Sequence, residues 1–375
     1  MNTSEPSHFL NHFYAMIKEF GEQPLLYEKR GGIFQYITYK EAATQLNSVA
    51  RALYANGIMQ DDRVAVQAQA SPQLWIAEWG ILANRAVEVI VPRSFNMEEL
   101  KETLLESKSK LLLVDTLAAA KAIANIAESL PDLNHIVCFE GRNEAPLILS
   151  WGEFIDSGRR QPDRATALVR SILPKDTAII FYYRTKDGAR QATRYTHGLL
   201  FEHAQKIDSI LSKASGIRQG NIILASAVWE YAISHIASCY FPLLKKAAIQ
   251  LTSDSADITH LENSPDIIIG GTAYLDTLRQ HVTSHVLQKG KMEYSMFVKA
   301  VALGKLKYES PKKLGLLQKA QNATLQAMVV KKIPKLLGEN LRLLIGTDDS
   351  VAYETHVFFH TLGIELAEIP PEVFR

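Results

Sequence analysis

The sequence has little cysteine, no excess charge of one sign and no long hydrophobic run. Cys138 and Cys239 lie about a hundred residues apart, so the chain lacks the paired spacing of a zinc site or a disulfide framework, and we expect two buried reduced thiols. The net charge of +1 excludes a global field that would draw the chain onto nucleic acid. No uncharged stretch reaches the ~18 residues of a membrane span, and the N-terminus lacks a basic start and an apolar core. A soluble, cytoplasmic protein is predicted.

What is present is enough apolar material for two cores. The chain has 375 residues, of which 47% are hydrophobic, and domains usually hold about 100–200 residues. Short β-branched runs alternate with amphipathic stretches, which is typical of strands joined by helices over a largely parallel sheet. Thr38 and Glu41 form a predicted capping box for a helix that runs to Ala55 and stops at Asn56-Gly57. The predicted fold class is α/β.

A polar stretch rich in glycine and proline at residues 150–175 indicates a subdomain boundary. We therefore predict a first α/β subdomain over residues 1–170 and a second over residues 171–375. The strands expected in the second are 178–182, 222–225, 247–251, 267–269 and 341–345.

Residues 286–335 carry a local excess of positive charge. Eleven lysines face only Glu293 and Glu309, a local net charge of +9. Apolar residues between the lysines predict an amphipathic basic helical region. This region either has a solvated polar face or, over residues 289–335, forms a surface that binds an anionic membrane or an acidic protein partner. Nucleic acid is disfavoured because stacking aromatics are sparse here. The candidate partner surface consists of Lys305, Lys307, Lys312, Lys313, Lys331 and Lys332.

Other chemistry finds little support. No Gly-x-Ser-x-Gly motif occurs, which argues against a hydrolase of that type. His281 and His285 are spaced i, i+4 as metal ligands often are, but no third ligand accompanies them. No metal site is predicted.

One stretch looks like a phosphate loop: a strand from Ala178 feeds a polar turn, and Thr196-His197 opens a helix. At this point the sequence resembles the adenylate-forming (AMP-binding) superfamily, and within it the N-terminal region of long-chain acyl-CoA synthetases. The order and spacing of motifs match from about residue 25 to residue 368. The segments that carry the resemblance are 37–41, 57–66, 196–200, 337–345 and 358–364. The resemblance implies two stacked α/β subdomains, as in the N-terminal domain of those enzymes.

Family members wrap ATP phosphates with a loop commonly written T-S-G-T-T-G-x-P-K-G, because glycine lets backbone N–H groups approach phosphate closely. Aligned through Thr196, the corresponding residues here keep one glycine of three, place an aspartate beside the would-be phosphate and replace the lysine by glutamine. Nearby arginines and a lysine leave weaker anion binding open. The predicted degenerate phosphate loop consists of Tyr183, Arg184, Thr185, Lys186, Asp187, Gly188, Gln191 and Thr196.

The resemblance also implies an adenine and magnesium site, and it too departs from the family's pattern. The Ser-Gly-Gly-Ala turn that lies beside adenine in the family is replaced by a turn with two carboxylates, and the stacking aromatic and the glutamate near magnesium are replaced further along. A register shifted by two would place Glu372 as that carboxylate. The predicted degenerate site consists of Thr347, Asp348, Asp349, Pro370 and Phe374. No cofactor is therefore expected, although the family uses ATP and magnesium.

The acyl site gives a weaker signal. Where the family places a Pro-Leu-x-His gate, this sequence has Trp229, Glu230 and Tyr231, which either fill the entrance or are ordinary core residues. A hydrophobic channel that reaches Gly270 and takes a fatty-acyl ligand stays open as an alternative.

These observations predict a catalytically degenerate acyl-CoA synthetase-like protein. Because the sequence stops at Arg375, we also expect it to lack the C-terminal lid domain of the family. Its predicted role is that of a binding, scaffold or regulatory subunit, peripheral on the inner face of a membrane or bound to a protein partner. The alternatives are a divergent active AMP-forming fatty-acid–CoA ligase and an acyl-binding protein.

Overall fold

The chain forms two compact α/β units, each built on a seven-stranded sheet. The computed structural model describes residues 8–141, 145–212, 214, 216–226, 229–252, 259–310, 315–328, 330, 333–348, 350–370 and 374. The first unit takes the described part of Met1–Leu26, Tyr36–Ala204 and Trp229–His235, and the second takes the described parts of Tyr27–Gln35, Gln205–Val228 and Ile236–Arg375. This division differs from the single boundary predicted at residue 170, because residues 177–196 pair with the first sheet.

The sheet of the first unit is parallel except at one edge. Its strand order is β7-β6-β5-β3-β4-β8-β9, and only the β8–β9 pair is antiparallel. Its strands are β3 (Arg63–Gln67), β4 (Val87–Ile90), β5 (Ser109–Val114), β6 (His135–Cys138), β7 (Ile148–Ser150), β8 (Thr177–Arg184) and β9 (Arg190–Thr196).

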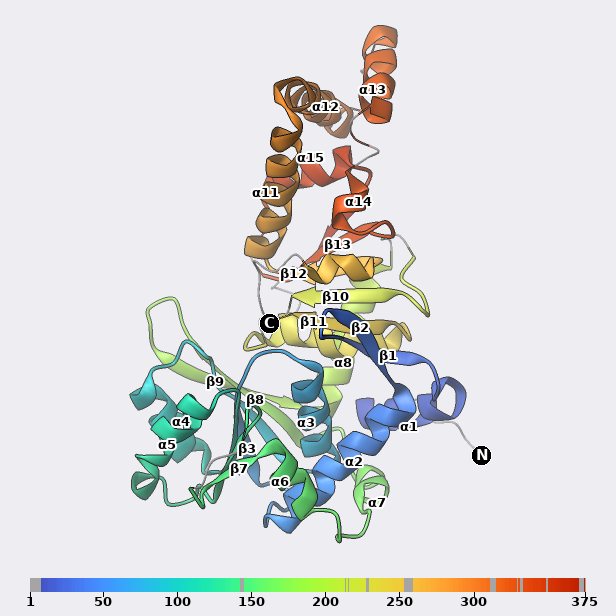
Figure 1. Ribbon diagram of the computed structural model, residues 1–375. Helices are drawn as coiled ribbons and strands as arrows, with labels where there is room; N and C mark the ends of the chain where they lie inside the picture. The colour runs from blue at the N-terminus through green and yellow to red at the C-terminus, as the bar shows by residue number, and fades with distance from the viewer. Residues whose placement is uncertain are drawn as a thin grey trace. The chain divides into compact units, whose positions relative to one another are not determined.

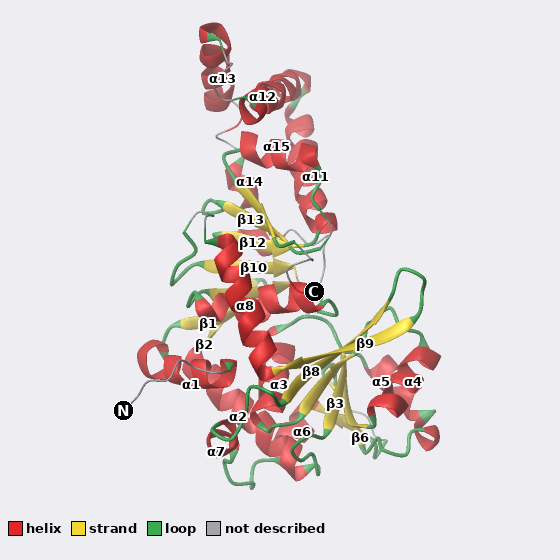
Figure 2. Ribbon diagram, turned by 180° about the vertical axis from the view of Figure 1, so that it is seen from behind, coloured by secondary structure: helices red, strands yellow, loops and turns green. Residues whose placement is uncertain are grey.

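Helices cover both faces of this sheet. The helices α4 and α5 lie on one face, and α2, α3 and α6 lie on the other (Figures 1 and 2). The bounds are α1 (Phe9–Phe20), α2 (Tyr39–Ala55), α3 (Pro72–Ala83), α4 (Met97–Ser107), α5 (Leu117–Ala124), a 3-10 turn at Ala127–Ser129, α6 (Trp151–Ser157), α7 (Ala165–Val169) and α9 (Ala232–His235). Local sequence sets the helix starts, as the capping boxes at Thr38, Asn96 and Ser150 show.

The second unit repeats the layered plan. Its strand order is β14-β13-β12-β10-β11-β1-β2, and the five strands from β14 to β11 are parallel. The strands are β1 (Pro24–Arg30), which begins in the first unit, β2 (Ile33–Thr38), which ends there, β10 (Ile222–Ser226), β11 (Ala248–Thr252), β12 (Ile267–Gly270), β13 (Leu343–Gly346) and β14 (Glu365–Glu368).

The helices of the second unit build an apolar core with β12 and β13. Leu344, Leu275, Phe297 and Phe359 are all buried in this core. The bounds are α8 (His197–Leu211), which begins in the first unit, a π-helical turn at Ile236–Tyr240, α10 (Phe241–Leu244), a 3-10 turn at Thr259–Asn263, α11 (Thr272–Lys289), α12 (Lys291–Glu309), α13 (Leu316–Met328), α14 (Pro334–Leu337) and α15 (Tyr353–Thr361).

The predicted fold class is confirmed, since two α/β sheets with interleaved helices are present. The five strands predicted for the second half form within one or two residues of their expected bounds, as β8, β10, β11, β12 and β13. The Thr38–Glu41 capping box is confirmed as well. Among the helices in the described ranges, none combines the length and the apolarity that crossing a membrane requires.

Candidate functional site

The stretch predicted as a degenerate phosphate loop is a regular β-hairpin. The predicted strand, β8, extends to Arg184, and β9 begins at Arg190 with Tyr183 opposite Gln191, so the polar turn between them is short. The tip therefore has only the five residues 185–189. Gly188 has a φ of +87°, a backbone conformation that favours glycine, and nothing lies within 4 Å of the position a Cβ would take. Gly188 is therefore explained by the backbone conformation of the turn.

The tip of the hairpin is closed by its own polar groups. The Thr185 N–H donates to the Ala189 carbonyl and the Gly188 N–H donates to the Thr185 carbonyl, both at 2.9 Å. The hydroxyl of Thr185 donates to the carboxylate of Asp187. This hydrogen bond lowers the pKa of the Asp187 carboxyl. The Asp187 carboxylate is therefore ionised and places a negative charge at the tip.

Two arginines beside the tip are directed at helix α4. Arg184 forms a two-pronged ion pair with Glu99 and stacks over the Phe95 ring at 5.2 Å. Arg190 lies 2.7 Å from the Glu106 carboxylate and 3.5 Å from that of Glu102. The hydrogen bond from Arg184 lowers the pKa of the Glu99 carboxyl. Both positive charges are balanced within the unit.

These contacts test whether a triphosphate fits the hairpin. A phosphate-binding loop needs outward N–H donors and unbalanced positive charge. Here the N–H groups of Thr185 and Gly188 are taken by the chain's own carbonyl oxygens, and the Asp187 carboxylate lies beside them. The residues present do not fit an ATP triphosphate held at this tip.

The residues that follow the hairpin have a structural role. Thr196 caps α8, since its hydroxyl accepts from the Leu199 N–H at 3.1 Å. His197 is buried and its ring centroid lies 5.8 Å from that of His8. Burial, followed by the charge of the neighbouring His8, lowers the pKa of His197 to about 3. A neutral, packed imidazole is the result.

At the end of β13, where the family's adenine turn was expected, an aspartate caps a helix. Asp348 accepts from the Thr272 N–H at 2.8 and 3.0 Å, at the start of α11. A side chain on Gly271 would meet the Asp348 carboxylate at 2.4 Å, which explains the glycine. Thr347 is buried, Pro370 is exposed and Phe374 is half-buried. Asp349 and Glu372 lie outside the described residues.

The residues predicted for an acyl pocket fall in both units. In the first, Trp229 is buried with its ring 4.6 Å from that of His235, Glu230 accepts from the Arg93 N–H at 2.6 Å, and Tyr231 is 58% exposed. In the second, a Cβ on Gly270 would lie 2.9 Å from the Tyr274 ring. Trp229 is therefore a core residue. Tyr231 is exposed to solvent and does not fill the entrance of an acyl pocket.

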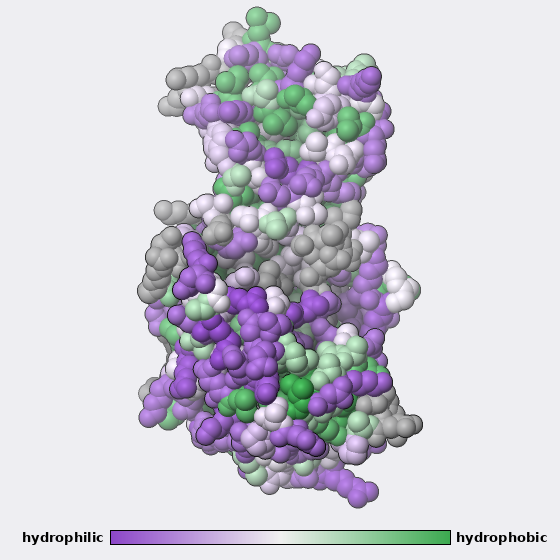
Figure 3. Space-filling model, turned by 90° about the vertical axis from the view of Figure 1, so that its left-hand side faces the viewer, coloured by the Kyte–Doolittle hydropathy of each residue, from purple (hydrophilic) through white to green (hydrophobic). Residues whose placement is uncertain are grey.

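The basic segment takes in the end of α11 and forms α12 and α13, so it is helical as the sequence predicts. Lys305 and Lys307 are exposed on α12, and Lys305 lies 5.5 Å from the centre of the Tyr353 ring. Figure 3 shows hydrophobic side chains among hydrophilic ones over the part of the second unit that α11 and α12 form. Lys312, Lys313, Lys331 and Lys332 lie outside the described residues.

Sequence reasoning missed a buried acidic cluster in the first unit. His235 Nε2 lies 3.0 Å from Glu78 Oε1, and both side chains are fully buried. Glu88 on β4 is also fully buried, and burial followed by the charge of Glu78 raises the pKa of its carboxyl well above the usual value. The sequence did contain a signal for this cluster, because Glu78 and Glu88 each lie inside an apolar run, PQLWIAEWGILA and VEVI. Across the described ranges, no group of three or more His, Cys, Asp or Glu has metal-binding geometry.

Comparison with known proteins shows what the chain resembles. The profile of the AMP-binding enzyme family matches residues 15–183. The long-chain-fatty-acid–CoA ligase FadD15 of Mycobacterium bovis is 20% identical over 341 residues, which cover 90% of this chain and 56% of that protein. The long-chain-fatty-acid–[acyl-carrier-protein] ligase AEE15 of Arabidopsis thaliana is 24% identical over 194 residues, 48% of this chain and 27% of that one. The chain spans a little over half the length of FadD15.

Solved structures show the same fold. The N-terminal domain of FACL13 from Mycobacterium tuberculosis superposes with a TM-score of 0.67 at 14% identity, covering 97% of this chain and 76% of that one. The anthranilate CoA ligase AuaEII, solved with anthranoyl-AMP, gives a TM-score of 0.68 at 15% identity, covering 98% and 61%. Residues 15–183 thus match the AMP-binding enzyme family, and the chain has the fold of the N-terminal region of adenylate-forming acyl-CoA ligases.

Proposed function

We propose that this acyl-CoA ligase-like chain acts by binding rather than by adenylation, and that its basic helices dock on an anionic membrane surface. The observation that supports the first part is the Asp187 carboxylate, which accepts from the hydroxyl of Thr185 at the hairpin tip. Stabilising the charge that develops in phosphoryl or adenylyl transfer requires positioned cations. Arg184 and Arg190 are instead paired with glutamates of α4.

Nucleotide binding is the direct test of the first part. We expect titration of Mg-ATP into the 375-residue chain to give no saturable heat up to millimolar nucleotide. A double variant, Asp187→Gly with Gln191→Lys, removes the internal carboxylate and restores a cation, so weak Mg-ATP binding is expected to appear in it. Micromolar binding of Mg-ATP by the unmodified chain would refute the proposal.

The outward face of α12 supports the membrane part. Lys299 and Lys305 are exposed next to Val298 and Leu306, which are 48% and 45% exposed. Met292, at the start of the helix, is 69% exposed. Apolar side chains that enter the headgroup region beside lysines that stay at its surface are typical of interfacial helices. Each lysine near an anionic leaflet contributes about 1 kcal/mol.

Charge reversal tests this surface. The triple variant Lys299→Glu, Lys305→Glu, Lys307→Glu is expected to lose at least about 100-fold in affinity for vesicles with anionic lipid, from about 1 kcal/mol per lysine. The matched control reverses three exposed lysines of the first unit, Lys121, Lys175 and Lys186, and changes the net charge equally. Equal loss in both variants would mean that only net charge matters, and an unchanged affinity in the α12 variant would remove the proposal. Binding of the intact chain to a purified acidic protein, with none to vesicles, would assign the surface to the other kind of partner.

An active ligase is the second candidate, because the match to FadD15 runs along 90% of this chain. It predicts fatty-acid-dependent conversion of ATP to AMP, measured with palmitate and CoA. A fatty-acyl carrier would instead bind palmitate with no effect of nucleotide.

A further inference from the structure

The first unit contains a cavity of about 440 Å³ that none of the sites above uses. It opens beside the starts of β3, β4 and β8, where Arg63, Val87 and Thr177 lie. Pockets that hold small molecules usually have about 300–1,000 Å³. Ligands of open α/β sheets bind outside the carboxyl ends of the strands. A cavity at the amino ends is therefore separate from a site of that kind.

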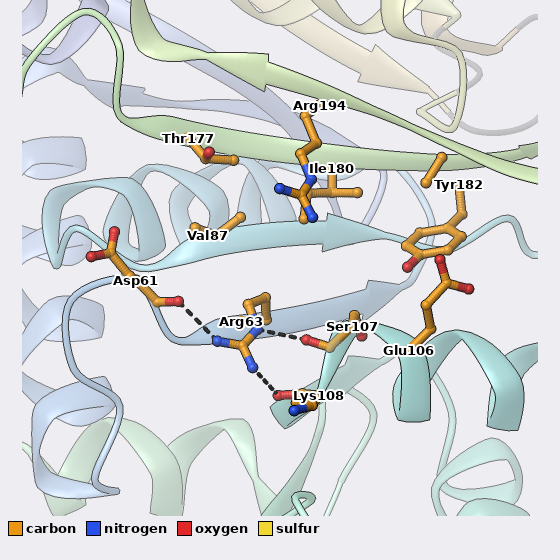
Figure 4. Close-up of a pocket in the computed structure, with 11 residues that line it drawn as sticks. Asp61, Arg63, Val87, Glu106, Ser107, Lys108, Thr177, Ile180, Tyr182 and Arg194 are labelled. Carbon is orange, nitrogen blue, oxygen red and sulfur yellow. Dashed lines mark hydrogen bonds between the residues drawn. The ribbon is translucent and has the colours of Figure 1, made fainter.

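An arginine is fixed in the wall of this cavity. The Arg63 guanidinium donates to the carbonyls of Asp61, Ser107 and Lys108, at 3.1 Å for Asp61 and 3.0 Å for Lys108 (Figure 4). Asp61 and Lys108 have φ values of +64° and +50°, which are uncommon for residues other than glycine. A guanidinium has five N–H donors, so these three bonds hold the group in place and leave two donors for a ligand.

A second arginine faces the same space from the opposite side. Arg194 lies across β8–β9 from Ile180 in the strand register, and its guanidinium points toward the middle of the cavity (Figure 4). It is exposed, and no ion pair of Arg194 occurs among the described residues. Two guanidinium groups that converge from different strands suit an oxyanion.

The charge of the cavity is positive and its floor is apolar. Of its two carboxylates, that of Glu106 is paired with Arg190 at 2.7 Å, which leaves the Asp61 carboxylate against Arg63, Lys108 and Arg194. The side chains of Val87, Ile180 and Tyr182 form a floor that is almost fully buried. Burial, followed by the charge of Glu106, raises the pKa of Tyr182 to about 12, so its ring stays neutral.

From this arrangement we propose that the cavity binds a small organic anion with a flat apolar body, its oxyanion held between Arg63 and Arg194 and its body on Ile180 and Tyr182. The site does not depend on the proposed function, since it uses neither the hairpin tip nor α12.

Calorimetry with phenyl phosphate tests the site. Phenyl phosphate is expected to bind with a dissociation constant below about 1 mM, and inorganic phosphate and benzyl alcohol, which each carry half of the recognised chemistry, at least about ten times more weakly. Arg194→Gln is expected to weaken phenyl phosphate binding at least about tenfold, and Arg194→Lys less, because lysine keeps the charge and loses the planar fork. Both changes are at an exposed position, so the thermal midpoint should not move.

Two further variants locate the bound anion. Ala192→Trp keeps every charge and places a bulky side chain at an exposed rim position on β9, so it should abolish binding if the cavity is the site. Lys186→Gln removes a cation from the tip of the same hairpin and should leave binding unchanged. Loss of binding in Lys186→Gln with retention in Arg194→Gln would move the anion to the tip and overturn the proposal, as would equal binding by the unmodified chain and Ala192→Trp.

Discussion

Replacing Gly304 with alanine is expected to destabilise the second unit by about 2–3 kcal/mol, the cost of overpacking a filled core. Gly304 lies in α12 where this helix packs on α15, and a Cβ there would come within 1.9 Å of Thr361 Oγ1. Rotating the threonine gives no full relief, because its Cβ does not move and would lie 2.9 Å away. In an exposed helix the same change would stabilise by about 1 kcal/mol, so the contact reverses the sign.

Urea denaturation followed by far-UV circular dichroism measures this effect. Ser295→Ala is the matched control, since Ser295 is exposed on the same helix and alanine there should change stability by a few tenths of a kcal/mol at most. Hydrogen exchange of the α12 amides should accelerate in Gly304→Ala and not in the control. A stability gain in both variants would show that α12 does not pack on α15 at this point.

Much of the fold was predictable because the local sequence patterns match the strands and helices that form. The buried strands read as short apolar runs, and the capping boxes state where helices start. The strand β9 was not predictable in this way, because its residues Arg190–Thr196 are mostly polar and exposed. It forms as an edge strand that pairs with β8, so tertiary pairing decides its structure and local propensity does not.

The contacts of the candidate site were not predictable from the sequence. The sequence placed a degenerate loop at residues 183–196, yet it could not show that Arg184 and Arg190 reach the glutamates of α4, which lie about 85 residues away in the chain. The arginine pair Arg63 and Arg194 is another such case, because the register of β8 and β9 brings them to one cavity. Contacts between distant segments follow from sheet order, which single-sequence patterns do not fix.

The buried acidic cluster is expected to make the stability of the first unit depend on pH. Glu88 is fully buried between Val64 and Ile179 of the neighbouring strands, and neither of its carboxyl oxygens has a hydrogen-bond partner among the described residues. The titratable groups near it are Glu78 on α3 and, bonded to Glu78, His235 on α9. Burial and the charge of Glu78 both disfavour the ionised form, so the pKa of the Glu88 carboxyl is raised well above its usual value.

This raised pKa makes the stability of the first unit depend on pH. Between the unfolded value near 4.3 and the higher folded value, the folded state holds a proton that the unfolded state releases. The contribution of Glu88 to the free energy of unfolding is therefore greatest at low pH and falls by about 1.4 kcal/mol per pH unit through this window. Glu88→Gln keeps a neutral side chain of the same shape, so this contribution should vanish, and the variant should exceed the unmodified protein by an amount that grows as pH rises above about 5.

Tryptophan fluorescence during urea denaturation isolates the effect, because Trp75, Trp79, Trp151 and Trp229 all lie in the first unit. Glu128→Gln, at an exposed position of the same unit, is the control and should follow the pH profile of the unmodified protein. Glu88→Leu should behave as Glu88→Gln does above pH 5, since an apolar group also needs no proton to be buried. Parallel profiles for Glu88→Gln and the unmodified protein would mean that the Glu88 carboxyl ionises normally inside the fold, and the apolar surroundings of β4 would then have to admit water.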